Sequence, residues 1–203
     1  SGNFDWTNGK FPELCEPDES YHGVTYTKQF GRAAYITKAR VQLMRDFGCY
    51  PAAHSVVPAQ PRSGDLPVRM RQYCENALTV AKFLESSDKI ASVRYPALPG
   101  NEHYERAQKY LPMGTSGVMS IDIKGGRAPA MKFMDSLKLA CNEVHVADIR
   151  TCVLHPASET HRQLTDEQLV AAGIEPGMVR ISVGLENVED IIADLKQALD
   201  TLD

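Results

Sequence analysis

The chain has 203 residues, of which 43% are hydrophobic and 7% aromatic, enough to build the core of one large or two small domains. Its 22 Lys and Arg are outnumbered by 26 Asp and Glu, and this scattered net charge of −4 argues against nucleic acid or an anionic membrane as a partner. No apolar run approaches the ~20 residues that span a bilayer and no signal-peptide pattern opens the chain, so we expect a cytoplasmic protein.

The first third of the sequence predicts an arm followed by two helices. Residues 1–29 are rich in Gly, Pro, Asp and Glu without a sustained period, which indicates an irregular segment at the surface. Phe30–Phe47 has a broad apolar face at helical spacing, and Gly48 is suited to end that helix. A second helix is predicted over Leu66–Leu84, closed by residues 86–88.

From residue 89 onward, short strands alternate with helices. We predict an α+β fold with about four strands in a small, mostly antiparallel sheet, one face of which is covered by helices. The predicted strands are 90–95, 117–124 and 178–183, with 143–146 and 152–154 as candidates for the rest of the sheet. The predicted helices are 102–110, 128–139, 165–172 and 188–199. A Ser/Thr-x-x-Glu/Gln capping box opens the third of these helices at Thr165, and Asn187 is the predicted N-cap of the last.

The strand 178–183 places one arginine in a defined position. Val179, Ile181 and Val183 alternate with Arg180 and Ser182, so an extended backbone buries the three branched residues and turns the other two to the opposite face. Beyond them, a glycine ends the strand. The strand therefore holds the guanidinium of Arg180 rigidly.

Two interpretations of Arg180 remain open on the residues alone. A planar guanidinium beside a cleft is well suited to bind a carboxylate through two hydrogen bonds. Buried arginines are more commonly paired with an acidic side chain, and this chain has many. The first interpretation predicts a substrate site, and the second a structural ion pair.

Other polar segments give weaker signals. His155–His161 is a polar loop after a strand, and its two histidines, six residues apart, match no metal-binding spacing, so we predict polar loop contacts and no metal site. Asp148, Arg150 and Thr151 predict either a small polar cluster or a solvated loop. The five cysteines form no CxxC pair, and no phosphate-binding loop, dinucleotide fingerprint or GxSxG motif occurs.

Several segments together carry a resemblance that covers nearly the whole chain. They are Gly2–Pro12, Ser20–Gly23, Ala33–Arg45, Leu66–Met70, Asp135–Leu139, His155–Ser158 and Val179–Glu186. These segments resemble the Cys/Met-metabolism family of pyridoxal-phosphate-dependent enzymes. The stretch Phe4–Pro12 is similar to the sulfhydrylase branch in particular, whereas the last two segments are shared by the family at large.

The resemblance implies the C-terminal part of an aspartate-aminotransferase-like (fold type I) enzyme that uses pyridoxal 5′-phosphate. The implied activity is γ-replacement, in which sulfide or methanethiol displaces acetate from O-acetylhomoserine to give homocysteine or methionine. Methionine γ-lyase and cystathionine γ-synthase chemistry are alternatives within the family, and a non-catalytic fragment is an alternative outside it. A small amino acid as substrate and a homo-oligomer, a tetramer of dimers, are also implied.

The resemblance also implies roles for individual residues. The arginine of the V-R-[LI]-S-V-G motif binds the substrate α-carboxylate in the family, and Arg180 occupies that position. Thr160 and Thr151 are the further substrate-binding residues implied, while no metal ligand is. Glu159 departs from the Thr or Met usual at its position.

Two larger departures from the family concern the missing upstream region and residues 57–65. The lysine that binds the cofactor lies upstream of Ser1 in the family, so we expect residues 1–65 to be the end of the cofactor domain, 66–203 to be the C-terminal domain, and this chain alone to be inactive. Val57–Asp65 carries two prolines where the family has an apolar helix, and we expect no stable helix over residues 56–65. Codons compatible with that stretch, read one base later, encode an apolar Phe-Leu-Leu-Asn-Leu-Gly-Leu-Glu, which predicts a pair of compensating frameshifts.

Overall fold

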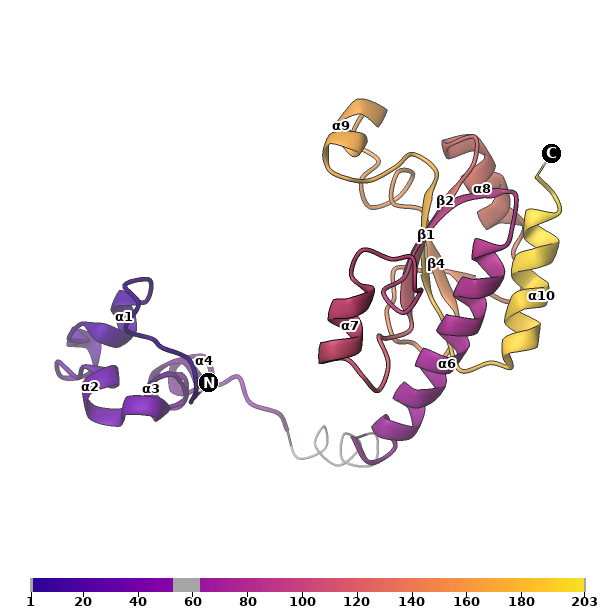
Figure 1. The fold of residues 1–203 in the computed structure, drawn as a ribbon. Coiled ribbons are helices and arrows are strands. Elements are labelled where there is room, and N and C mark those ends of the chain that lie inside the picture. Colours follow the sequence, from indigo (N-terminus) through magenta and orange to yellow (C-terminus); the bar gives the residue numbers. More distant parts are fainter. Residues whose placement is uncertain (1, 53–62, 203) are drawn as a thin grey trace. The chain divides into compact units, whose positions relative to one another are not determined.

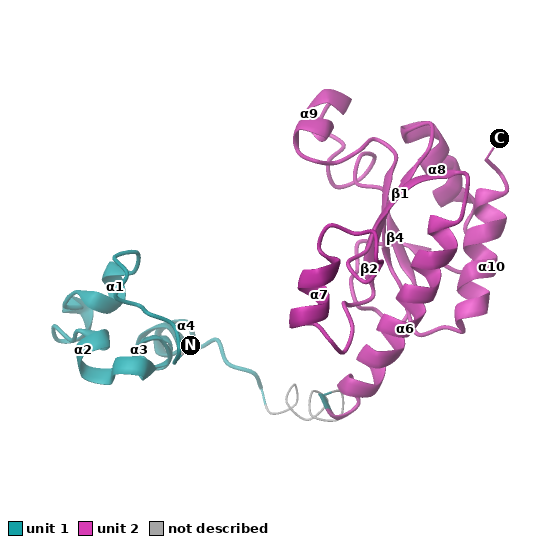
Figure 2. Ribbon diagram, viewed as in Figure 1, with its two compact units in different colours: residues 1–63 teal, residues 64–203 magenta. Residues whose placement is uncertain are grey.

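A computed structural model describes residues 2–52 and 63–202 of the chain. The expectation of no helix over residues 56–65 falls mainly outside these ranges. The chain divides into two compact units, Ser1–Ser63 and Gly64–Asp203 (Figure 2). Each unit is described by itself below.

The first unit consists of short helical segments around a small core. The helices are α1 (Pro12–Cys15), α2 (Tyr26–Phe30), α3 (Ala34–Lys38) and α4 (Arg45–Phe47), with 3-10 turns at Glu19–Tyr21 and Gly31–Ala33 and a π-helical segment at Ala39–Met44. The predicted helix over residues 30–47 is therefore present as a series of helical segments, and Gly48, at φ 64°, ends it as expected. The buried core of this unit is Leu14, Tyr26 and Ala34.

The apolar face predicted for residues 30–47 is largely exposed. Four of its large side chains are 40% to 75% accessible to solvent, namely Ile36, Leu43, Met44 and Phe47, and so is the neighbouring Tyr35. Tyr35 stacks on Trp6 with 5.1 Å between ring centroids, which covers one of its faces. The small core of this unit does not bury the rest of that face.

The second unit is an α+β domain (Figure 1). Its helices are α6 (Leu66–Glu85), α7 (Tyr104–Tyr110), α8 (Arg127–Ser136), α9 (Asp166–Ala171) and α10 (Val188–Leu199). Its strands are β1 (Ile90–Arg94), β2 (Val118–Ile123), β3 (Cys141–Asn142), β4 (Cys152–Leu154) and β5 (Met178–Ser182). The sheet has the order β1-β2-β5-β4-β3, antiparallel except for the parallel pair β3 and β4.

This architecture confirms the predicted fold class and most of its elements. The capping box at Thr165 is present, since its hydroxyl accepts from the Gln168 N–H while the Gln168 side chain accepts from the Thr165 N–H. The Asn187 side chain caps α10 by accepting from the Glu189 N–H at 3.1 Å. The predicted strand 143–146 is wrong, because the edge strand is the two-residue β3 and the following residues form a loop.

Helix α8 ends at Ser136, three residues before its predicted end. The buried Asp194 of α10 explains the difference. Its carboxylate accepts hydrogen bonds from the backbone N–H groups of residues 138–140 at 2.8, 2.9 and 2.9 Å, which requires a backbone that has left the helix.

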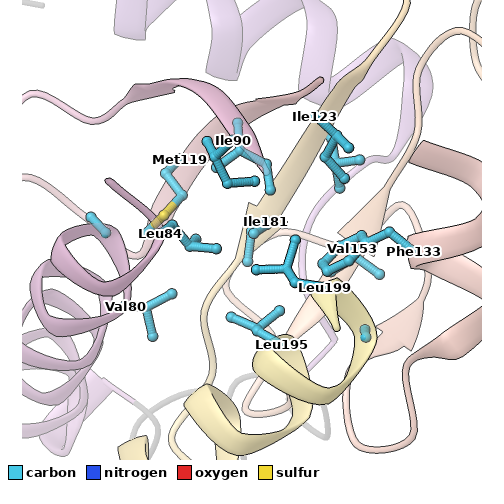
Figure 3. Close-up of a cluster of buried hydrophobic side chains, with 14 of the residues drawn as sticks. Val80, Leu84, Ile90, Met119, Ile123, Phe133, Val153, Ile181, Leu195 and Leu199 are labelled. Carbon is cyan, nitrogen blue, oxygen red and sulfur yellow. The ribbon is translucent and has the colours of Figure 1, made fainter. Parts of the chain in front are cut away.

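The hydrophobic core lies between one face of the sheet and the helices α6, α8 and α10 (Figure 3). The sheet contributes alternate residues, with Met119 opposite Ile181 and Ile121 opposite Val179 in the register of β2 and β5. Leu84 of α6, Phe133 of α8 and Leu195 of α10 face them. The other sheet face is thereby left for the polar residues of β1, β2 and β5. None of the helices within the described ranges combines the length and apolarity needed to span a membrane.

Candidate functional site

A row of four side chains crosses the sheet on the face opposite the core. In the strand register, Arg94 of β1 lies opposite Ser120 of β2, which lies opposite Arg180 of β5, which lies opposite Leu154 of β4. Directly opposed residues on one sheet face project side by side. The fold therefore brings two arginines, separated by one serine, to the same surface.

This surface is the floor of a cavity of about 560 Å³. Thr160 and His161, from the loop after β4, and Ile174, from the segment before β5, form its walls. The volume falls in the range of small-molecule sites. The structure thus brings together Arg180 and Thr160, two of the residues that sequence analysis identified, and adds Arg94, which it missed because only the strand register places Arg94 beside Ser120.

Arg180 has no acidic partner within ion-pair distance in the described part of the chain. One of its terminal nitrogens donates to the carbonyl oxygens of Val144 at 2.7 Å and His145 at 3.4 Å. Its Nε is buried and has no hydrogen-bond partner. An unpartnered buried donor costs about 1–3 kcal/mol, so this guanidinium has bonding capacity that the described residues leave unused.

The carbonyl groups that contact Arg180 belong to the loop predicted as a strand. Two hydrogen bonds and one turn of the backbone fix that loop. The Ala147 N–H donates to Ser182 Oγ at 3.0 Å, the Tyr73 hydroxyl donates to the Asp148 carbonyl at 3.1 Å, and Ala147 adopts a positive φ of 60°. Because Ser182 is two residues from Arg180 on β5, the same strand positions both the arginine and the loop that orients it.

A charged network lies on the outer side of this loop. The Arg150 guanidinium contacts Glu143 at 3.0 Å and Asp148 at 3.3 Å, and His145 Nδ1 lies 2.9 Å from Glu143. Hydrogen bonds from Arg150 lower the pKa of Asp148 to about 2. The predicted polar cluster therefore exists for Asp148 and Arg150.

Thr151 belongs to a different set of contacts and does not line the cavity. It is fully buried, with its N–H donating to Glu186 Oε1 at 2.6 Å and its hydroxyl donating to Glu186 Oε2 at 2.9 Å. The same hydroxyl accepts from the Gly184 N–H at 2.9 Å, and Asn76 of α6 donates to the Gly184 carbonyl at 3.1 Å. These bonds join the start of β4 to the end of β5, so Thr151 acts on the site by holding the strand of Arg180.

The loop His155–His161 is held by its first histidine. His155 is buried, with Nε2 2.8 Å from the Pro176 carbonyl oxygen and Nδ1 2.8 Å from Ser158 Oγ. Because a carbonyl oxygen only accepts, Nε2 carries a proton, and the second ring nitrogen is bonded to the serine hydroxyl. Thr160, at the other end of the loop, is exposed toward the cavity and lies 2.9 Å from His161 Nδ1.

One group of side chains has metal-ligating atoms close together. Single ligand atoms of Glu143, Asp148 and Cys152 lie within 4.8 Å of one another. The guanidinium of Arg150 already compensates both carboxylates. Burial raises the pKa of the Cys152 thiol, which disfavours the thiolate that binds metals. We assign no metal to this group.

Comparison with known proteins gives one consistent family. The model of the family described as Cys/Met metabolism PLP-dependent enzyme matches residues 29–200. The O-acetyl-L-homoserine sulfhydrylase of Leptospira meyeri is 44% identical over 209 residues, covering 98% of this chain and 47% of the relative. The O-acetyl-L-homoserine sulfhydrylase 1 of Thermus thermophilus is 42% identical, again over 98% of this chain and 47% of the relative.

Solved structures agree with the sequence matches. A Campylobacter jejuni structure described as an O-acetylhomoserine (thiol)-lyase superposes with a TM-score of 0.84 at 33% identity, covering 96% of this chain and 46% of that chain. That structure contains a pyridoxyl-lysine phosphate. The present chain spans about half the length of the curated relatives it matches.

The described residues do not by themselves form a pyridoxal-phosphate site around Arg180. Pyridoxal enzymes of this kind bind the cofactor aldehyde through a lysine amine, and no described lysine lines the cavity. Lys89, Lys124 and Lys132 lie around a separate hollow of about 490 Å³ whose lining includes no aromatic ring to stack on a pyridine. What the described site offers is a cavity lined by the guanidinium of Arg180, which has no acidic partner among the described residues.

Proposed function

Because the chain belongs to the family of Cys/Met metabolism PLP-dependent enzymes, we propose that it provides the substrate-carboxylate site of an O-acetylhomoserine sulfhydrylase. The overall reaction joins O-acetylhomoserine and sulfide, or a small thiol, to give homocysteine or its thioether, with release of acetate. Pyridoxal phosphate supplies an electron sink in enzymes of this family. The residues of this chain bind and orient the amino acid.

The state of Arg180 is the observation that carries the proposal. A structural arginine would be expected beside a carboxylate of its own chain, whereas Arg180 contacts only two carbonyl oxygens and leaves Nε unpartnered in the described part of the protein. A substrate carboxylate can accept from the two terminal nitrogens of the guanidinium, in the two-point geometry that arginine favours. This supports the interpretation of Arg180 as a substrate ligand over that of an ion pair.

The surrounding contacts support the same assignment. The strand β5 holds the arginine backbone, and the loop 143–148 holds its side chain through the carbonyls of Val144 and His145. Thr160 places a hydroxyl at the wall of the same cavity. A ligand that reaches Arg180 therefore meets a preformed pocket with little reorganisation to offset its binding.

The names of the relatives favour the sulfhydrylase reaction over elimination or cystathionine synthesis. Proteins named for O-acetyl-L-homoserine sulfhydrylase or homocysteine synthase match nearly all of this chain at 38% to 44% identity. We further propose that the assembled enzyme is a homo-oligomer, as the family resemblance implies.

A chimaera tests the proposal. The present chain replaces the corresponding part of the Leptospira meyeri enzyme, and homocysteine formation is compared for Arg180, Arg180→Lys and, as a control, Arg106→Lys on α7, which is exposed and outside the cavity. Lysine retains the charge and loses the planar pair of donors, so we expect kcat/KM to fall roughly 10- to 100-fold. The visible absorbance of the bound cofactor should not change in Arg180→Lys. The control variant should keep the kcat/KM of the unsubstituted chimaera.

The competing interpretation predicts a different pattern. If Arg180 were only structural, Arg180→Lys would lower the melting temperature while the folded fraction retained its affinity for O-acetylhomoserine. Both quantities are measured on the same preparation, and an unchanged affinity contradicts the proposed role.

A further inference from the structure

The second arginine of the cavity has no role in the function proposed above. Arg94 occupies the last position of β1, on the same sheet face as Arg180 and two strands away from it. Adjacent strands lie about 4.8 Å apart, so the two backbones are separated by about 10 Å. Both side chains line the one cavity.

Arg94, like Arg180, has no carboxylate within ion-pair distance among residues 2–52 and 63–202. Its single hydrogen bond is a long one, 3.3 Å from a terminal nitrogen to the Gly173 carbonyl oxygen. Arg94 does interact electrostatically with Asp122. Burial and the charge of Glu175 raise the pKa of Asp122 and the charge of Arg94 lowers it, so the arginine and this carboxyl interact only across a distance.

The floor between the two arginines is suited to a short ligand. Ser120 lies between them and offers a hydroxyl, while Leu154 and Ile174 give apolar contact. Two cations that line one small cavity repel each other, and an anion bound between them relieves that repulsion. Such an arrangement matches a ligand with a carboxylate at each end and methylene groups in the middle.

We propose that Arg94 is a second carboxylate-binding residue of the Arg180 cavity, so that the site accepts one carboxylate at each arginine. The inference rests on the proposed function for the first carboxylate, the one at Arg180. The second carboxylate has two possible sources, the side chain of an acidic amino acid or a free carboxylate such as the acetate that the reaction releases. In either case Arg94 sets which substrates or products the cavity holds.

Norleucine and 2-aminoadipate test the inference, because they differ only in a terminal methyl group or a terminal carboxylate. Each is titrated into the isotopically labelled 203-residue chain, and dissociation constants are obtained from the shifts of backbone amide signals of β2 and β5. One charge-assisted bond predicts that 2-aminoadipate binds about tenfold more tightly than norleucine. Arg94→Met should abolish that preference and leave norleucine binding unchanged, Arg94→Lys should retain part of it, and Arg106→Met should have no effect.

A third titration separates the two sources. Acetate is added to the chain saturated with norleucine. Acetate binding that is lost in Arg94→Met indicates a subsite open to a released carboxylate, whereas tight 2-aminoadipate binding without acetate binding indicates a carboxylate carried on the side chain. Both results support the second site.

The inference and the proposed function fail in distinguishable ways. Equal affinity of the wild-type chain and Arg94→Met for 2-aminoadipate, or no measurable binding of 2-aminoadipate, overturns the inference. If norleucine binds to the wild-type chain but not to Arg180→Met, and the wild-type chain does not prefer 2-aminoadipate, the inference is overturned and the proposed function stays intact. Norleucine binding that survives Arg180→Met contradicts the proposed function, whatever Arg94 does.

Discussion

Replacing Gly184 by alanine should destabilise the second unit strongly, because the junction between β4 and β5 has no room for a methyl group. A Cβ at this position would lie 2.5 Å from both the Arg150 carbonyl carbon and the Thr151 amide nitrogen, and it would also collide with Glu186. The two backbone atoms would have to retreat by about 0.9 Å to reach the 3.4 Å of ordinary contact. Backbone atoms within a bonded network cannot move in this way without breaking hydrogen bonds.

The cost follows from the bonds at that junction. Overpacking of this kind costs about 1–3 kcal/mol. The displaced Thr151 N–H also loses its 2.6 Å bond to the Glu186 carboxylate, a charge-assisted bond worth about 1.5–3 kcal/mol. We therefore expect Gly184→Ala to lower the free energy of unfolding by about 3–5 kcal/mol, a large part of the total for a domain of this size.

Urea unfolding followed by the amide signals of β5 measures this change for the second unit alone. Gly100→Ala is the matched control, because no atom lies within 4 Å of a Cβ at that position and its φ is not positive. The free energy of unfolding of the control should stay within about 0.5 kcal/mol of the wild-type value. If Gly184→Ala unfolded at the same urea concentration as the control, the close packing at this junction would have been misread.

Two further predictions concern carboxylates of the same unit. The pKa of Asp148 is about 2 in the folded protein and about 3.9 in the unfolded chain. Its ionised carboxylate therefore contributes fully to folding stability above about pH 5, and this contribution is lost as the pH falls toward 2. Asp148→Asn should therefore reduce the drop in urea midpoint between about pH 5 and pH 3, and an equally steep drop in the variant would argue against this origin. Asp194→Ala removes the acceptor of the N–H groups of residues 138–140 and should cost about 3 kcal/mol in urea unfolding at neutral pH. A loss well below about 1 kcal/mol would mean that water replaces the carboxylate there.

Those parts of the fold that depend on local signals were predicted correctly from the sequence. The alternation around Arg180 gave the strand β5 and its buried face, and a threonine followed by a glutamine three residues later gave the start of α9. Gly48 ended its helix with the left-handed backbone that favours glycine. In each case neighbours within four residues determine the result.

The errors arose where distant residues decide the local structure. Residues 143–146 have strand-forming composition, yet the carbonyls of Val144 and His145 accept from Arg180, 36 and 35 residues away along the chain. Helix α8 ends early because Asp194 attracts the following backbone from more than 50 residues away. The contact of Thr151 with Glu186, which follows the end of β5, also joins residues 35 positions apart in the chain. The hydrophobic periodicity of one segment does not show which distant residues it contacts.

Arg94 shows the same limit for the candidate site. On its own strand it is one exposed polar residue, two positions before Pro96, and nothing in the segment distinguishes it from a solvated arginine. Arg94 can be recognised as a residue of the site only from the register of β1, β2 and β5, which places it in one row with Ser120 and Arg180. A site built across a sheet is therefore harder to find in sequence than one built along a strand.

The two outer strands of the sheet have a consequence for solubility. A long, flat outer strand presents free N–H and C=O groups to which another molecule can add a strand, which is a common start of aggregation. At one border, β1 carries an irregularity between Ile90 and Ser92 that interrupts its ladder. At the other, β3 has only two residues and is followed at once by the charged Glu143. Neither border offers an uninterrupted template, so this sheet is poorly suited to grow by recruiting strands from other chains.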